Sequence, residues 1–156
     1  MNLLASLLPL SNVELDIDAR DKGAALERAA QLFENNQGLS GSRIVECLTA
    51  REQLGSTGLG KGVAIPHGRL RGLKRAAAAI IRVKEPIEFD SPDGQPVWLL
   101  VVLLVPEHAT QQHLEILSEL AQMLSEPSMR GQLQTIAQPA ALLATVAAWE
   151  PIRPAA

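Results

Sequence analysis

The chain has 156 residues, of which 47% are hydrophobic and 20% charged, which is the composition of a globular protein long enough to bury a core of its own. The net charge is −3 and no basic run occurs, so nucleic acid is not expected as a partner. The longest apolar run, Val97–Val105, is about half as long as a membrane-spanning helix, so no direct membrane insertion is expected.

The first third of the chain predicts one strand and two helices. Val13–Ile17 alternates apolar and polar residues, which is typical of a half-buried strand. Asp21–Asn36 carries its apolar residues on one face, which predicts an amphipathic helix. Ser40 or Ser42 can cap a second helix that runs to about Gln53.

The middle of the chain predicts strands. Val63–Ile65 is a short buried strand, and the β-branched residues of Ala77–Val83 favour another. Ile87–Phe89 and Val97–Val105 are expected to pair as a hairpin around the turn residues Ser91–Gly94. Because Val97–Val105 is apolar on both faces, it belongs in the middle of a sheet that is covered by helices on each side.

The last third predicts helices. Thr110–Ser125 is a long helix, Pro127 opens another, and Pro139–Trp149 forms the last one. Residues 1–150 are expected to form a single domain and residues 151–156 a flexible C-terminal tail. The predicted class is α/β, with a mixed β-sheet sandwiched between α-helices.

The stretch "LGSTGLGKGVAIPHGRL", Leu54–Leu70, has the spacing of a nucleotide-binding P-loop at Gly55, Gly60 and Lys61. A P-loop lies between a strand and a helix, and a Ser or Thr after its lysine holds Mg²⁺. Here a helix comes before and a strand after, and the residue that follows the lysine is Gly62. We therefore reject a nucleotide site.

The same glycines have two other interpretations. With Ser56 and Thr57 between them, they can bring backbone N–H groups and hydroxyls close to an oxyanion, or they can simply form a helix stop and a turn. Arg51 lies on the apolar stripe of the preceding helix, in its last turn. There it either faces an anion, extends to solvent or caps the carbonyls of its own helix.

The three histidines differ in their surroundings. His67 lies between Pro66 and Gly68 in a turn after a buried strand, which should display its imidazole at the sheet edge as a candidate nucleophile. His113 lies at the apolar edge of the long helix and is either a core residue or a site residue. His108 is in a loop and is expected to be solvated. His67 and His113 lack a third ligand at a recognisable spacing, so no metal site is expected.

Two segments resemble a known family. "AREQLGSTGLGKGVAIPHGR" (Ala50–Arg69) and "PVWLLVVLLVPEHATQQHLEILSELAQML" (Pro96–Leu124) are similar to the fructose/mannitol-type IIA domain of the bacterial phosphotransferase system, and in particular to its nitrogen-regulatory IIA branch. The resemblance extends from about Leu4 to Trp149 and implies a mixed sheet flanked by helices. It also implies a phosphorylated histidine at His67, a phosphate-facing Arg51, a second active-site histidine at His113, and a neighbouring loop that contains Ser56 and Thr57.

This resemblance implies a regulatory phosphocarrier. The protein would accept a phosphoryl group on His67 from a histidine phosphocarrier protein of the nitrogen branch. It would control target proteins, in regulation of the nitrogen or potassium type, by its phosphorylation state. It would be a phosphotransferase component and not a free-standing metabolic enzyme. No cofactor is expected, because the donor is a phosphohistidine and not ATP. The single cysteine, Cys47, fits a reduced, cytoplasmic setting.

Two alternatives remain at this point. In the first, the protein is a IIA subunit that passes phosphoryl groups to a IIB domain for sugar uptake. In the second, it is a non-catalytic binding module whose histidines are structural.

Overall fold

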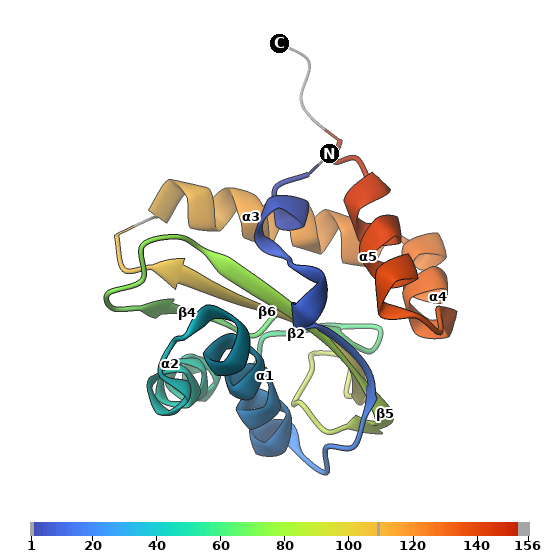
Figure 1. Ribbon diagram of the computed structural model, residues 1–156. Coiled ribbons are helices and arrows are strands. Elements are labelled where there is room, and N and C mark those ends of the chain that lie inside the picture. Colours follow the sequence, from blue (N-terminus) through green and yellow to red (C-terminus); the bar gives the residue numbers. More distant parts are fainter. Residues whose placement is uncertain (1, 109, 153–156) are drawn as a thin grey trace.

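The computed structural model describes residues 2–108 and 110–152, which form a mixed sheet between two layers of helices (Figure 1). The strands of the described residues are β1 (Val13–Ile17), β2 (Gly58–Gly60), β3 (Val63–Ala64), β4 (His67–Leu70), β5 (Ala77–Ile87) and β6 (Val97–Pro106). Their order is β1-β5-β6-β3-β2, and β4 also pairs with β6. β6 runs antiparallel to β5 and parallel to β3 and β4, so the sheet is mixed as predicted.

Helices cover both faces of this sheet. The α-helices of the described residues are α1 (Lys22–Gln37), α2 (Gly41–Leu54), α3 (Thr110–Ser125), α4 (Pro127–Thr135) and α5 (Pro139–Ala148). Figure 1 shows α1 and α2 on one side of the sheet and α3, α4 and α5 on the other. Short 3₁₀ turns at Leu4–Leu7 and Leu10–Asn12 precede β1.

β6 separates two hydrophobic cores. Leu99, Val101 and Leu103 are buried in the core that includes α3, α4 and α5. Leu100 and Val102 are buried in the core that includes α1 and α2. Because side chains alternate between the faces of a strand, a strand that is buried on both faces must be apolar throughout, as this one is. The predicted α/β sandwich is confirmed.

Local sequence signals set the helix ends. The Asp21 side chain accepts a hydrogen bond from the backbone N–H of Ala24 and caps α1. That helix ends at Gly38, whose φ of 69° is left-handed and suits a glycine. Of the two serines predicted to cap α2, Ser40 is the one that does so.

The structure corrects three strand boundaries. The two predicted segments Ala77–Val83 and Ile87–Phe89 are one strand, β5, which pairs with β6. A register shift lies between Arg82 and Ile87, and the three residues before Ile87 are exposed. This interruption of the apolar pattern made one strand look like two. Phe89 lies beyond the end of the strand, and β3 ends at Ala64 and not at Ile65.

The glycine-rich segment contains a strand that the sequence did not predict. Gly58–Gly60 forms β2, which turns back through Lys61 and Gly62 to pair with β3. Gly62 has a φ of 87°, and a Cβ atom there would lie 2.2 Å from Nε1 of Trp98. Glycine is therefore required at this turn by both its conformation and the close packing. His67 is likewise not in a turn, because it is the first residue of β4.

Two further features concern predictions made from composition. Among the described residues, no helix is long and apolar enough to cross a membrane. Most of the predicted tail, residues 153–156, lies outside the described residues. The preceding Ile152 donates a backbone hydrogen bond to the side chain of Gln122 on α3.

Candidate functional site

The fold brings His67 and His113 together from distant parts of the sequence. His67 pairs with Leu103 of β6, whose side chain lies in the core on the α3 side of the sheet. Paired residues of neighbouring strands project to the same face, so His67 faces α3. His113 lies on α3, and the two ring centroids are 5.3 Å apart with an interplanar angle of 65°. The rings therefore meet edge to face.

A backbone hydrogen bond defines the tautomer of His67. Its Nδ1 lies 2.8 Å from the carbonyl oxygen of Ile65. Because a carbonyl can only accept, Nδ1 must carry the proton, and in the neutral ring Nε2 then has the free lone pair. Burial lowers the pKa of His67, and the charge of Arg51 lowers it further; the bond to Ile65 and the carboxylate of Glu52 oppose these effects. The net direction is downward, which favours the neutral, nucleophilic ring.

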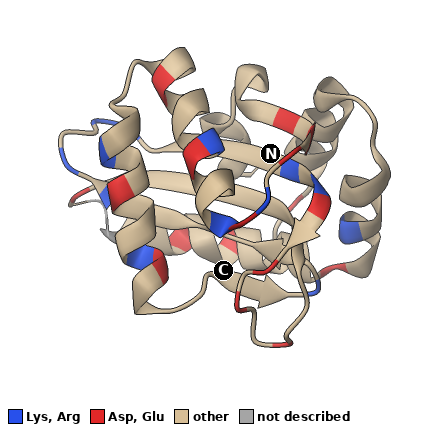
Figure 2. Ribbon diagram, turned by 90° about the horizontal axis from the view of Figure 1, so that it is seen from below, with Lys and Arg blue, Asp and Glu red and all other residues tan. Residues whose placement is uncertain are grey.

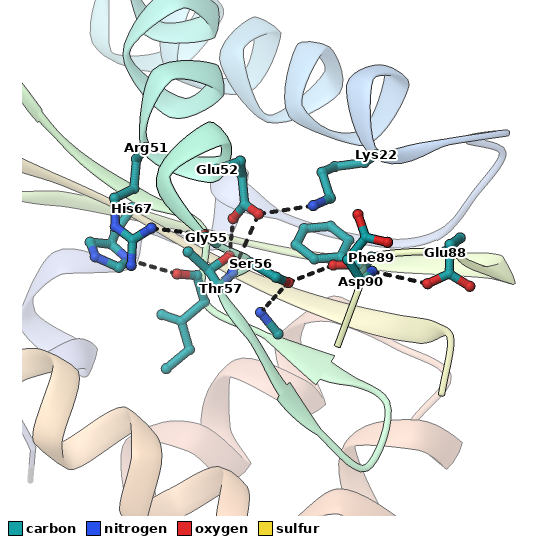
Figure 3. A network of polar contacts seen from close by, with 12 residues as sticks. Lys22, Arg51, Glu52, Gly55, Ser56, Thr57, His67, Glu88, Phe89 and Asp90 are labelled. Carbon is teal, nitrogen blue, oxygen red and sulfur yellow. Dashed lines mark hydrogen bonds and ion pairs between the residues drawn. The ribbon is translucent and has the colours of Figure 1, made fainter. Parts of the chain in front are cut away.

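Arg51 lies beside both histidines. It is in the last turn of α2, and its Nη1 donates a 2.9 Å hydrogen bond to the carbonyl of Gly55, just beyond the helix. Figure 3 shows its side chain next to His67, and its charge lowers the pKa of both His67 and His113. Arg51 thus caps its own helix and also places a positive charge at the two rings. The capping interpretation and the anion-facing interpretation are compatible.

Ser56 and Thr57 lie in the loop beside Arg51, but their hydroxyls point to other partners (Figure 3). The Ser56 hydroxyl donates to the carbonyl of Phe89 and accepts from the N–H of Gly58 at 3.1 Å. The buried Thr57 hydroxyl donates to the carboxylate of Glu52. In this structure both hydroxyls hold the shape of the loop.

Glu52, which lies under the loop, has a role that the sequence pattern did not predict. Its side chain is 5% exposed, accepts the hydroxyl and the backbone N–H of Thr57, and forms a 3.0 Å ion pair with Lys22 of α1. Lys22 in turn lies over the ring of Phe89, 4.4 Å from its centroid. A glutamate next to Arg51 in the sequence looks like a solvent-facing residue, and only its partners from α1 and the loop reveal its role.

Replacement of Glu52 by Gln should loosen the loop and lower the pKa of His67. The amide keeps the size of the side chain but removes the charge that pairs with the partly exposed Lys22, so we expect a loss of stability of about 1–3 kcal/mol. The carboxylate now raises the pKa of His67, and its removal should move the ring titration to lower pH. Chemical denaturation and NMR titration measure the two effects. An unchanged His67 titration would contradict this placement of Glu52.

His113 has a buried nitrogen with no partner. Within the described part of the chain, its Nε2 makes no hydrogen bond although the atom is buried. Burial lowers the pKa of His113, and the charges of His67, Arg69 and Arg51 lower it further. An unsatisfied buried polar atom costs about 1–3 kcal/mol, which is unexpected for a purely structural side chain. The arrangement instead suits a hydrogen-bond donor whose acceptor would be a group bound beside His67.

The family resemblance implies that His67 is phosphorylated, and on that expectation replacement of His113 by Gln should leave the fold intact and weaken the reaction. We expect slower labelling or a shorter-lived adduct, because one donor to the phosphoryl oxygens is lost or misplaced. In the parent protein, phosphorylation should raise the pKa of His113, since a nearby dianion favours the charged ring. NMR titration before and after labelling tests this shift. An unchanged titration together with parental transfer rates would make His113 a core residue only.

The lowered pKa of His67 also predicts how acceptance of a phosphoryl group, which the family resemblance implies, should depend on pH. A histidine with an ordinary pKa of about 6.5 loses its free lone pair as the pH falls through that value. Because the pKa of His67 is lowered, His67 should remain a competent phosphoryl acceptor at more acidic pH than a free histidine.

Among the described residues, no group of three His, Cys, Asp or Glu side chains could hold a metal ion.

Comparison with known proteins assigns this chain to a class. The chain belongs to the family described as "Phosphoenolpyruvate-dependent sugar phosphotransferase system, EIIA 2", which matches residues 6–149. It is thus a IIA-type protein of the phosphotransferase system.

Within that class the relatives include nitrogen regulatory proteins. The chain is 43% identical over 122 residues to a "Nitrogen regulatory protein" of Pseudomonas aeruginosa, which covers 78% of this chain and 79% of the relative. It is 49% identical to the solved structure of nitrogen regulatory protein IIA-Ntr from Neisseria meningitidis, with a TM-score of 0.89 over 93% of this chain and 99% of that one. The predicted resemblance to the nitrogen-regulatory branch is confirmed.

A sugar-transport relative is also found. The "PTS system fructose-specific EIIABC component" of Bacillus subtilis is 30% identical over 131 residues, which are 83% of this chain and 21% of the relative. Similarity to this chain therefore extends to a protein whose name describes a fructose-specific component of the phosphotransferase system.

Proposed function

We propose that the protein is a regulatory phosphocarrier that accepts a phosphoryl group on Nε2 of His67 from a phosphohistidine carrier protein. The observation that carries this proposal is the hydrogen bond from Nδ1 of His67 to the carbonyl of Ile65. It fixes the ring and leaves the Nε2 lone pair available beside the cation of Arg51. His113 also lies there, and its Nε2 has no hydrogen-bond partner among the described residues.

The transfer needs no added proton or metal. The lone pair of His67 Nε2 attacks phosphorus, the N–P bond of the donor breaks, and its electron pair returns to the donor's ring nitrogen. The transition state is loose and spreads charge over the equatorial oxygens, so catalysis depends mainly on positioning and electrostatic stabilisation. Arg51 supplies the charge and His113 a hydrogen bond. Glu52, Ser56 and Thr57 position the loop that accepts from Arg51 at Gly55.

Exposed leucines near the site support a protein as the donor. Leu54 is 85% exposed at the end of α2, and Leu114 is 62% exposed on α3. Leu54 precedes Gly55 and Leu114 follows His113 in the sequence. Large apolar side chains that flank a site in this way are typical of protein contact surfaces.

We assign residues 1–150 to this IIA-type domain and 151–156 to a tail.

Regulation is favoured over sugar transport by the names of the relatives described above. In this proposal the phosphoryl group adds about two negative charges around His67. Target proteins in nitrogen- or potassium-type regulation then distinguish the phosphorylated from the unphosphorylated form. The test is incubation with the phosphorylated carrier protein, followed by addition of candidate IIB domains. Labelling that is not passed on to any IIB domain supports regulation, and rapid transfer to one supports transport. A chain that is never labelled is a binding module.

A further inference from the structure

A row of cations leads away from His67 along β4. In this strand His67 and Arg69 alternate with the buried Gly68 and Leu70, so their side chains project to the same face. The charge of Arg69 lowers the pKa of His113, which places this arginine close to the second histidine. Arg71 follows directly after the strand and is exposed. The row of cationic side chains therefore begins beside His67 and His113.

The row widens into a basic surface beyond the strand. The Nη2 atom of Arg43 on α2 donates a 2.8 Å hydrogen bond to the carbonyl of Arg71, which brings the two residues together. Lys74 and Arg75 are exposed in the loop that leads to β5. We call this surface the basic edge, and it consists of Arg43, Arg69, Arg71, Lys74 and Arg75.

Few acidic groups neutralise the basic edge. Within the described residues, its one ion pair joins Arg71 to Glu107 at 4.0 Å, and their side chains are 87% and 48% exposed. An exposed pair of this length contributes little. Yet the whole chain has a net charge of −3, with 17 acidic against 14 basic residues. In Figure 2 acidic and basic segments are otherwise interspersed over the ribbon. Within the described residues, four of the five cations of the basic edge have no ion pair, so this cluster is a local departure from the charge of the protein.

We propose that the basic edge is the docking surface for an acidic face of the phosphoryl-donor carrier protein, an inference that rests on the proposed function. A donor whose histidine reaches Nε2 of His67 must also cover Arg69, which projects from the next outward position of the same strand. Complementary charge at such a surface steers the encounter and raises the association rate.

The transferred group also promotes release of the donor. Before transfer, the basic edge faces an acidic donor that carries the additional charge of its phosphoryl group. After transfer, about two negative charges sit on His67, at the head of the row, and the donor has lost the same charge. The attraction between the two proteins therefore falls at the moment when they must separate.

Charge reversal on the basic edge tests this surface. Arg71→Glu and Arg75→Glu together should slow phosphoryl transfer from the phosphorylated carrier protein by at least about tenfold at low ionic strength, and the difference should shrink as salt is added. Only the backbone carbonyl of Arg71 is used by Arg43, so the side chain can be changed without loss of that bond. The measurement is the rate of labelling of His67 over a salt series.

Lys84→Glu is the matched control. Lys84 is exposed near the Val97 end of β6, whereas His67 pairs with Leu103, so the two lie about 20 Å apart along the sheet. This single charge reversal should change the rate of His67 labelling by the carrier protein less than about twofold. Arg75→Glu alone, which changes the net charge by the same amount, should slow transfer measurably more.

A small phosphoryl donor separates this inference from the proposed function. Labelling of His67 by phosphoramidate needs no docking surface, so Arg71→Glu/Arg75→Glu should match the parent protein. Parental rates for this double variant with the carrier protein at low salt would overturn the basic edge as a docking surface. So would a loss that persists at high salt or appears with phosphoramidate. If neither donor labels His67 in the parent protein, the proposed function itself fails, and this inference with it.

Discussion

His67→Gln should abolish phosphoryl acceptance, a loss of more than about a thousandfold. Glutamine fills similar space but has no ring nitrogen with a free lone pair, which Nε2 of His67 supplies in the neutral ring. Phosphorus NMR and mass spectrometry after incubation with the carrier protein should find an acid-labile, base-stable adduct on the parent protein and none on the variant. The fold should survive, because one hydrogen bond to a carbonyl contributes only about 0.5–1.5 kcal/mol.

The other two histidines are the controls for this result. His108→Gln should be labelled at the parental rate, because His108 is exposed in the loop after β6. His113→Gln should still be labelled, although more slowly. Persistent labelling of His67→Gln would move the acceptor to another residue and refute the assignment.

Arg51→Gln should give the second-largest effect, with phosphoryl transfer slowed about 10- to 100-fold. This follows from the loss of a charge-assisted contact to the transferring group, worth about 1.5–3 kcal/mol. The hydrogen bond to Gly55 is lost or weakened as well, so a small decrease in the melting temperature should accompany the kinetic effect. Because the positive charge of Arg51 lowers the pKa of His67, the variant should also titrate at higher pH. Single-turnover kinetics and NMR titration measure these changes.

Arg51→Lys distinguishes the charge from the geometry. Lysine keeps the positive charge but lacks the planar fork, which can bind an anion while it donates to Gly55. We expect it to restore much of the low pKa of His67 but only part of the transfer rate. If Arg51→Gln unfolds while its remaining folded fraction transfers at the parental rate, Arg51 has a structural role alone.

Features that depend on neighbours in the chain were predictable from the sequence. The ends of α1 follow from Asp21 and Gly38, because a cap and a left-handed stop act over one turn of helix. The central place of Val97–Val105 follows from its apolar residues on both faces, and this strand requires helical layers on each side. The sandwich could therefore be predicted, and the family motif proposed His67 as the candidate nucleophile.

Tertiary structure alone decided the partners of the site residues. His113 meets His67 because β4 pairs with β6 in a register that turns His67 towards α3, and no local pattern encodes that register. In the same way, Glu52 is buried because Lys22 approaches it from another helix and Thr57 from the loop. A side chain's hydrogen-bond partner depends on which distant segment packs against it, whereas helix and strand patterns depend on near neighbours. The sequence by itself thus determined the layers and the candidate nucleophile, and long-range packing determined how the site around that nucleophile is built.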